Sequence, residues 1–278
     1  MLGKSIYNFL KSDFQVYTNG LKKRRYDLCK KKNLSILLDN TKPDVIINSL
    51  GITNIEICNK NKKLAKKVNF EILKNLFNIK KRYNYKFWLI QISTDQLYDA
   101  ISFKTKSREE SKVKINNYYT KTKVQAERIC ESNKSLILRT NFFGKSIVKK
   151  KSFSDWVLKS SKKKETFYLF KDIYFSPLRF ITICRILKTI IQNNFDTSGI
   201  YNLGSKNGLS KLNFSLFFLK YLKIKNKNFK IASVNKILKT KRSKNMLMNV
   251  EKFENTFKIK LPNLISEITN EAKENYLN

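Results

Sequence analysis

The stretch that decides the fold is Phe87-Trp88-Leu89-Ile90-Gln91-Ile92, which runs directly into Ser93-Thr94-Asp95. An apolar run of this length, rich in aromatic and branched side chains, is typical of a strand that is buried on both faces. The three polar residues stand where that strand ends. Since ligands bind at the carboxyl ends of the strands in a parallel sheet, the stretch predicts a buried strand that carries hydroxyl groups to a binding site.

Similar segments lie on both sides of this strand and alternate with helical ones. Further strands are predicted at residues 14–17, 44–48, 136–139 and 199–204. Helices are predicted at residues 28–40, 64–82, 117–132, 153–159 and 212–222. This alternation indicates βαβ units and an α/β fold with a doubly wound parallel sheet. Asn48 and Asn141 also lie at the ends of predicted strands, so we expect them at the same edge of the sheet as Thr94.

The composition excludes several classes of protein. With 278 residues, 41% of them hydrophobic, the chain can bury the core of one large domain or of a domain with a second lobe. No apolar stretch is long enough to span a membrane. The chain has no His, which excludes His-based triads and His metal ligands, and its four Cys have no CxxC spacing. We therefore expect no metal site and reduced, buried thiols in a cytoplasmic protein.

The formal net charge is +37, because 58 Lys and Arg face only 21 Asp and Glu. The excess is mostly Lys and is spread along the whole chain, as codon bias in an AT-rich genome would produce. Arg, which commonly reads bases, is sparse. We therefore expect no nucleic-acid partner, although the positive field favours anionic substrates and cofactors.

A second motif carries the chemistry. Tyr119 and Lys123 are four residues apart in a predicted helix, so their side chains project from the same face. An ammonium group beside a phenol favours the phenolate, and we expect Lys123 to lower the pKa of Tyr119. A Ser or Thr hydroxyl at a strand end can hold the same substrate oxygen. Together these residues predict proton delivery to a carbonyl group during its reduction.

An ordered series of segments resembles the extended short-chain dehydrogenase/reductase family, most closely its dTDP-4-dehydrorhamnose reductase branch. The segments include Ile92-Ser93-Thr94-Asp95 and the Tyr119–Lys123 pair, which is followed by Ala126-Glu127. The others lie at residues 43–48, 68–69, 97–99, 138–144, 172–177 and 199–204. A Tyr-x-x-x-Lys motif alone is weak evidence, whereas this series covers nearly the whole chain in the family's order.

The resemblance implies a Rossmann-type sheet that binds NADPH or NADH, and a smaller lobe that holds a nucleotide-sugar. Residues 1–145 would form the cofactor domain. Residues 146–278 would form mainly the substrate lobe, with segments that return to the first domain. The implied function is a NAD(P)H-dependent reductase of a nucleotide-activated 4-keto-6-deoxy sugar, and a homodimer is compatible with it.

The resemblance also implies a role for each matching residue. Tyr119 would donate the proton, Lys123 would hold the nicotinamide ribose, and Thr94, rather than Ser93, would bind the carbonyl oxygen. Asp95 is expected to be structural, or to act from behind the residues that touch the substrate, rather than to be catalytic. The implied cofactor contacts are Met1, Leu2, Gly3, Asn48, Ser49, Asn69, Ser93, Tyr119 and Lys123, and the implied substrate contacts are Thr94, Asp95, Asn141 and Arg242.

The chain departs from the family at its start. Relatives open with a β-strand and a glycine-rich turn, whereas Met1-Leu2-Gly3-Lys4 resembles only the end of that turn. We therefore expect a sheet without its first strand, owing to a misassigned start or a truncation rather than to a natural variant that lacks the cofactor. After the predicted strand at 14–17, Lys22, Lys23, Arg24 and Arg25 form either a site for the 2′-phosphate of NADPH or ordinary lysine-rich surface.

Two other functions stay open. An epimerase or dehydratase of the same family would use a carboxylate beside the Thr, and Asp95 is available for that role. A non-catalytic binding or regulatory subunit would explain the absent glycine turn.

Overall fold

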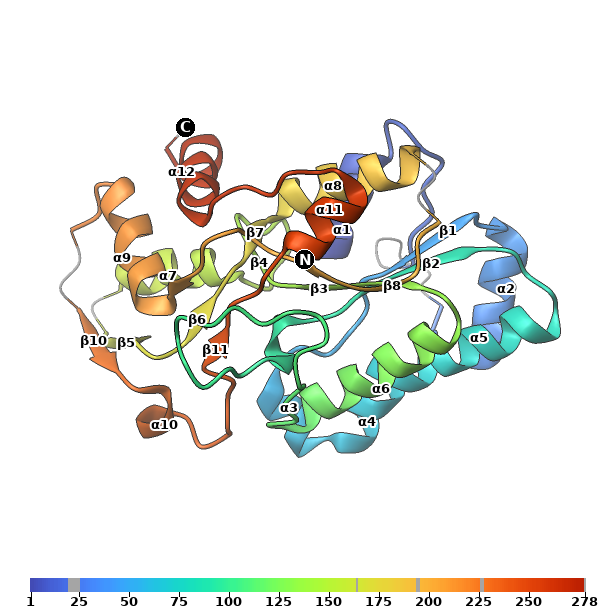
Figure 1. Ribbon diagram of the computed structural model, residues 1–278, viewed down its shortest axis with the longest axis horizontal. Coiled ribbons are helices and arrows are strands. Elements are labelled where there is room, and N and C mark those ends of the chain that lie inside the picture. Colours follow the sequence, from blue (N-terminus) through green and yellow to red (C-terminus); the bar gives the residue numbers. More distant parts are fainter. Residues whose placement is uncertain (20–25, 164, 194–195, 226–227, 278) are drawn as a thin grey trace.

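A four-stranded parallel sheet lies at the centre of the computed structural model, which describes residues 1–19, 26–163, 165–193, 196–225 and 228–277 (Figure 1). The strand order is β1-β2-β3-β8. The strands are β1 (Val45–Asn48), β2 (Trp88–Ile92), β3 (Leu136–Thr140) and β8 (Gly199–Leu203). In the register, Ile90 of β2 pairs with Ile47 of β1 and with Leu136 of β3. The strands predicted at 44–48, 87–92, 136–139 and 199–204 are therefore confirmed.

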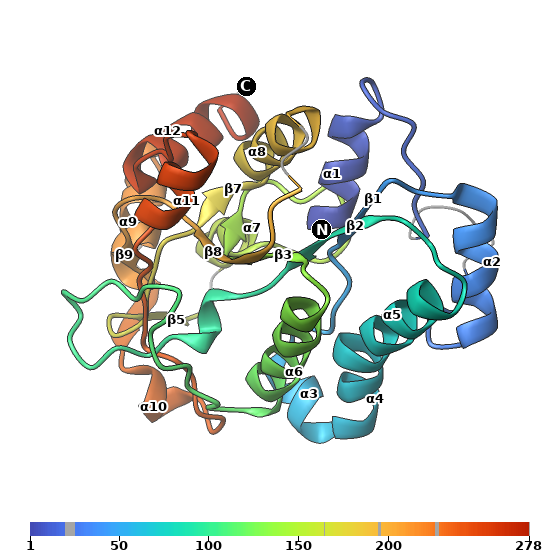
Figure 2. The same cartoon turned by 45° about the vertical axis from the view of Figure 1, so that its right-hand side comes forward.

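Helices cover both faces of this sheet, as Figure 2 shows. One face packs against α1 (Leu2–Leu10), α8 (Phe180–Gln192) and α11 (Glu251–Phe257), and the other against α2 (Lys31–Thr41), α5 (Ile72–Arg82) and α6 (Tyr118–Ser132). Strand side chains alternate between the faces. Leu136 and Leu138 accordingly pack in the hydrophobic cluster with α1, α8 and α11, and Ile137 packs in the cluster with α2, α5 and α6. The fold is the predicted Rossmann-type, doubly wound α/β fold.

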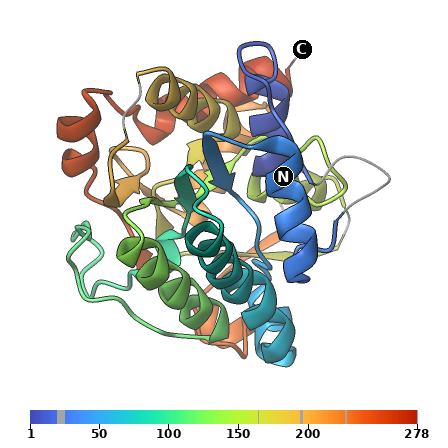
Figure 3. The same cartoon turned by 90° about the vertical axis from the view of Figure 1, so that its right-hand side faces the viewer.

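The predicted helix at 64–82 is confirmed, but one of its turns is irregular. It consists of α4 (Lys62–Lys66), the π-helical turn η1 (Lys67–Glu71) and α5. The side chain of Asn69, within η1, bonds to both backbone groups of Ile52 and to the Thr122 hydroxyl. Figure 3 shows α5 and α6 side by side below the sheet. The short helix α3 (Ile55–Lys60) precedes this segment.

The predicted strand at 14–17 is wrong. This segment is irregular, and no strand of the described chain pairs with it. Phe14 and Val16 pack against the hydrophobic cluster beneath α1 and α8, which explains the apolar pattern. A strand needs a neighbour for its N–H and C=O groups. Within the described residues, β1 is an edge strand of the sheet, and all four of its residues are only half-buried.

The remaining elements form a smaller lobe beside the sheet. Its helices are η2 (Asp95–Leu97), α7 (Phe153–Ser161), α9 (Lys211–Tyr221), α10 (Val234–Ile237) and α12 (Leu264–Asn275). Its strands are β4 (Phe142–Phe143), β5 (Phe167–Phe170), β6 (Tyr174–Phe175), β7 (Leu178–Arg179), β9 (Leu209–Ser210), β10 (Phe229–Ala232) and β11 (Asn245–Met246). Its core is rich in Phe side chains, among them Phe143, Phe175 and Phe214. The helices predicted at 153–159 and 212–222 are confirmed as α7 and α9.

Two predictions from composition can be compared with these coordinates. All four Cys are free thiols, and three of them are buried, whereas Cys29 is half-buried. Among the described helices, none is long and apolar enough to span a membrane.

Candidate active site

The polar residues at the end of β2 meet the first turns of α6. This helix begins with a capping box, in which Asn117 and Thr120 each bond to the other's backbone N–H group. The cap fixes the start of the helix and turns Tyr119 and Lys123 toward the sheet, where each is only 5% exposed. Thr94 is also 5% exposed and lies near the Tyr119 phenol. The structure therefore brings Thr94, Tyr119 and Lys123 together.

The predicted direction of the Tyr119 pKa is wrong. Burial raises the pKa of the phenol, and the effect of the neighbouring Thr94 opposes this rise while the Asp95 carboxylate adds to it. The Lys123 ammonium does not compensate, because it donates to the carbonyl oxygen of Ile92 at 2.8 Å and lies beside Glu127. Burial lowers the pKa of Lys123 to about 8. The surroundings of Tyr119 therefore favour its protonated form.

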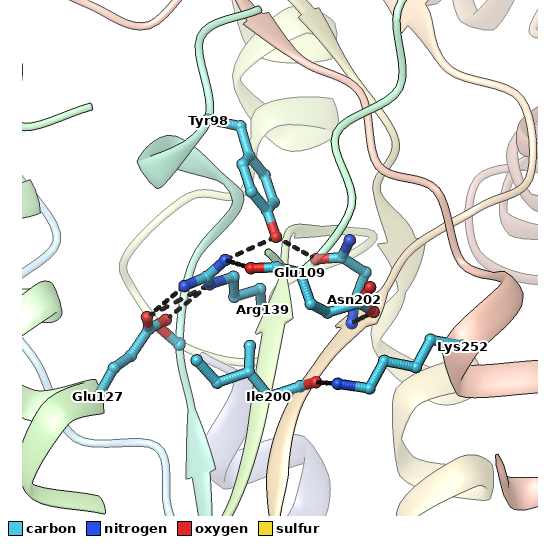
Figure 4. A network of polar contacts seen from close by, with 8 residues as sticks. Tyr98, Glu109, Glu127, Arg139, Ile200, Asn202 and Lys252 are labelled. Carbon is cyan, nitrogen blue, oxygen red and sulfur yellow. Dashed lines mark hydrogen bonds and ion pairs between the residues drawn. The ribbon is translucent and has the colours of Figure 1, made fainter. Parts of the chain in front are cut away.

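Ser93 belongs to a buried network beneath the site rather than to the face of Tyr119. Its hydroxyl donates to Glu127 Oε1 at 2.5 Å, and Glu127 forms an ion pair of 2.8 Å with Arg139. Arg139 also donates to the Tyr98 hydroxyl at 2.7 Å, and Tyr98 donates to Asn202 at 2.8 Å (Figure 4). This network joins β2, α6, β3 and β8. It holds the end of β2 in place and leaves Thr94 as the hydroxyl beside Tyr119.

Asp95 and Asn141 lie next to Thr94. Asp95 is fully buried, accepts a hydrogen bond of 2.7 Å from Asn141 Nδ2, and has its Oδ1 atom 3.4 Å from Thr94 Oγ1. Burial raises the pKa of Asp95 to about 7. Arg242, also predicted to bind substrate, donates to Glu56 of α3 at 2.5 Å, while its Nε atom is buried without a partner among the described residues.

The residues predicted to bind the cofactor form a second group, at the end of β1. Gly3 lies in the first turn of α1 so close to Ser49 that a Cβ atom on it would come within 2.6 Å of Ser49 Oγ. No side chain caps α1, and burial, together with the positive charge of Lys150, lowers the pKa of the Met1 amino group. A helix N-terminus with free N–H groups and a nearby cation suits a phosphate group. Met1, Leu2 and Gly3 thus form the N-terminus of α1, and Gly3 lies against Ser49.

Asn48 and Asn69 support this group instead of facing it. Asn48 donates to Gln91 Oε1 at 2.7 Å and accepts from the Leu50 N–H group, while Asn69 uses its side chain on Ile52 and Thr122. Both side chains fix the loop that follows β1. Lys22, Lys23, Arg24 and Arg25, the predicted 2′-phosphate site, lie outside the described residues.

The family model of the RmlD substrate binding domain matches residues 1–276. The chain belongs to this family. Its structure is similar to that of a dTDP-4-dehydrorhamnose reductase from Clostridium acetobutylicum, with 21% identity, 98% of this chain and 95% of that chain covered, and a TM-score of 0.84. It is also similar to the dTDP-4-dehydrorhamnose reductase of Bacillus anthracis in complex with NADP. The identity is 19%, the match covers 98% of this chain and 95% of that chain, and the TM-score is 0.87. A dTDP-glucose 4,6-dehydratase of Bacillus anthracis in complex with NAD is similar as well. Here the identity is 15%, the match covers 99% of this chain and 94% of that chain, and the TM-score is 0.79.

These similarities confirm the family and the fold that the sequence motifs predicted. A search of curated proteins found no match to the chain.

The sequence did not reveal Lys211, the first residue of α9. Its Nζ atom lies 4.9 Å from the ring centre of Phe153 and 5.8 Å from that of Phe175. Burial lowers the pKa of Lys211 to about 8, while the Asp95 carboxylate opposes this shift and the Arg242 charge adds to it. One Lys among 58 basic residues carries no local signal. Glu127 was missed as the partner of Arg139, although an Arg inside the apolar run at 136–139 is such a signal, because a buried charge needs a partner.

Proposed function

We propose that this protein is a NAD(P)H-dependent reductase of a nucleotide-activated 4-keto-6-deoxy sugar, with an activity like that of the dTDP-4-dehydrorhamnose reductases. The observation that carries the proposal is the grouping of Thr94, Tyr119 and Lys123 at the end of β2. Membership of the RmlD family and the similarity to a reductase solved with NADP support it.

Each residue group has a distinct task in this proposal. Met1, Leu2, Gly3 and Ser49 hold the cofactor diphosphate, and Lys123 binds the nicotinamide ribose. The cofactor, when bound, supplies the hydride for the carbonyl carbon. Thr94 orients the carbonyl oxygen by hydrogen bonding, and Tyr119 gives it a proton, a step that commonly contributes about 10²- to 10⁴-fold to the rate. Asn141 and Arg242 bind the substrate from the side of the smaller lobe.

The test is the oxidation of NADPH or NADH by the purified protein in the presence of dTDP-4-keto-6-deoxy sugars, followed by the nicotinamide absorbance. Tyr119→Phe removes only the phenol oxygen and should lower the rate of turnover by about 10²- to 10⁴-fold. Tyr118→Phe is the matched control, because this neighbouring ring faces Lys62 and Lys121 rather than Thr94. No turnover with any of these sugars, or full activity of Tyr119→Phe, would refute the proposal.

A dehydratase of the same family is the second candidate, favoured by the buried Asp95 carboxyl beside Thr94 and by the similarity to a dTDP-glucose 4,6-dehydratase. A dehydratase regenerates its nicotinamide in each cycle, whereas a reductase consumes it. Stoichiometric loss of NAD(P)H therefore separates the two reactions.

We also keep four further predictions as proposals: a cytoplasmic location, a homodimer, the absence of a nucleic-acid partner, and the division at residue 145 into cofactor domain and substrate lobe. The molar mass in solution tests the dimer.

A further inference from the structure

Arg242 and Glu56 form an ion pair that joins the smaller lobe to the side of the central sheet. Arg242 lies in the segment before β11, and Glu56 lies in the first turn of α3, which follows β1. The Arg242 Nη2 atom donates to Glu56 Oε1 at 2.5 Å, and the Thr240 hydroxyl donates to Glu56 Oε2. One carboxylate therefore holds two residues of the segment 240–243.

The segment 240–243 lies at the candidate active site. The Ser243 hydroxyl donates to the backbone carbonyl oxygen of Gln96 at 2.8 Å, within η2 at the end of β2. The backbone carbonyl oxygen of Lys241 accepts from the side chain of Asn117, the cap of α6, at 3.2 Å. The segment therefore bridges the two elements that carry the candidate catalytic side chains.

The ion pair leaves the Arg242 guanidinium incompletely satisfied. Its Nε atom is buried and has no hydrogen-bond partner among the described residues. The Nε–H and Nη–H groups of an Arg side chain form a fork that matches two oxygens of one carboxylate or phosphate. Glu56 gives only one oxygen to this fork, because its other oxygen accepts from Thr240. A buried N–H group without an acceptor is costly, so a ligand with two suitably spaced oxygens would bind Arg242 better than Glu56 does.

We propose that the ion pair between Glu56 and Arg242 is a latch that the diphosphate of the nucleotide-sugar opens. The proposal rests on the nucleotide-sugar substrate of the proposed function. Without substrate, Glu56 holds the segment 240–243 against α3. When substrate binds, two diphosphate oxygens accept from the Arg242 fork and Glu56 is released to solvent. Glu56 thus competes with the substrate and lowers its affinity, and no covalent bond changes in the exchange.

The charge and exposure of the two side chains suit such an exchange. A diphosphate carries more negative charge than a carboxylate, and Arg commonly binds phosphate through two parallel hydrogen bonds. The Glu56 side chain is 52% exposed and that of Arg242 is 23% exposed, so released Glu56 regains water. A partly exposed ion pair contributes little to stability, and the latch therefore opens at small cost. The pair of Glu127 and Arg139 has no such route, because both side chains are buried.

Titration calorimetry of the full chain with dTDP, in the absence of cofactor, tests the latch. Glu56→Gln removes the competing charge and should tighten dTDP binding by about 2- to 5-fold, the range expected for a partly exposed ion pair. Arg242→Gln should weaken binding by about 10- to 100-fold. Arg242→Lys should weaken it nearly as much, because an ammonium group lacks the fork.

Glu251→Gln is the matched control, since Glu251 also pairs with an Arg and the variant changes the net charge by the same amount. It should leave dTDP binding unchanged. The double variant E56Q/R242Q separates a latch from a general effect of charge. If Glu56 acts by competing for Arg242, the double variant should bind dTDP no more tightly than Arg242→Gln alone.

Four results would overturn the latch: no dTDP binding by the wild type, unchanged or weaker binding by Glu56→Gln, a gain that persists in the double variant, or wild-type affinity of Arg242→Lys. The expected binding pattern combined with no NAD(P)H oxidation by any 4-keto sugar would instead refute the proposed reductase function and leave the latch standing.

Discussion

Replacing Arg139 with Met should destabilise the protein strongly, because it leaves a buried charge without a partner. The side chains of Arg139 and Glu127 are each only 4% exposed. Arg139 donates to both Glu127 oxygens, to the Tyr98 hydroxyl and to the Glu109 carbonyl oxygen. Removing one member of a buried ion pair costs about 3–5 kcal/mol. Since domains are stable by only about 5–15 kcal/mol, this change removes a large share of the free energy of unfolding.

Urea unfolding followed by circular dichroism measures this loss. The matched control is Arg108→Met, because Arg108 also pairs with a Glu, but its side chain and that of Glu251 are 62% and 66% exposed. An exposed pair contributes about 0–1 kcal/mol, so the control should differ little from the wild type. The double variant E127L/R139M should cost about 1–3 kcal/mol less than the sum of its two single variants. If Arg139→Met cost no more than Arg108→Met, or if the single variants were additive, the account of the network would be refuted.

Three further predictions concern the site and the packing around it. Tyr119→Phe should lower the reductase rate by about 10²- to 10⁴-fold with little change in the NADPH dissociation constant, and a similar loss in Tyr118→Phe would contradict the assignment. The pKa of Asp95 is raised from 3.8 to about 7 in the folded protein, which then binds more protons than the unfolded chain between these values. The free energy of unfolding of the wild type, relative to that of Asp95→Asn, should therefore fall as the pH rises from about 4 to about 7 and stay level above. If urea titrations gave the same pH dependence for both proteins, the raised pKa of Asp95 would be excluded. Gly208→Ala should cost about 1–3 kcal/mol in the same titration, because its Cβ atom would lie 2.1 Å from Leu247 and 2.6 Å from the Phe175 carbonyl oxygen. Gly51→Ala, whose nearest contact would be 3.3 Å, should cost less, and equal costs would count against the packing argument.

The sheet could be predicted because its strands are short apolar runs whose polar ends share one edge. The segment at 14–17 has the same local pattern, yet a strand exists only where another strand binds its backbone, and that condition is not local. Phe14 and Val16 are apolar because they pack beneath α1 and α8.

The site could be predicted in part, for an equally physical reason. The spacing of Tyr119 and Lys123 fixes the helix face they share, and the end of β2 fixes Thr94. The spacing does not fix where a long Lys side chain ends, and Lys123 bonds to Ile92 instead of acting on the phenol. The sequence could not decide between the hydroxyls of Ser93 and Thr94, because the Ser93 hydroxyl is bound by Glu127, which comes from another element. Lys211 reaches the site from α9, far along the chain, so only the folded structure reveals it.

The π-helical turn at Lys67–Glu71 can be counted as one inserted residue in an otherwise regular helix. Each residue of an α-helix advances by about 100°, so the insertion rotates all of α5 by that angle relative to α4. Ile72, Leu73, Leu76 and Phe77 are buried against the sheet only in this rotated phase. Deleting one residue from the turn would make the helix regular and would at the same time direct its apolar face away from the core. The loop after β1, which binds Asn69, therefore helps to set the angular position of a helix that lies mostly beyond its reach.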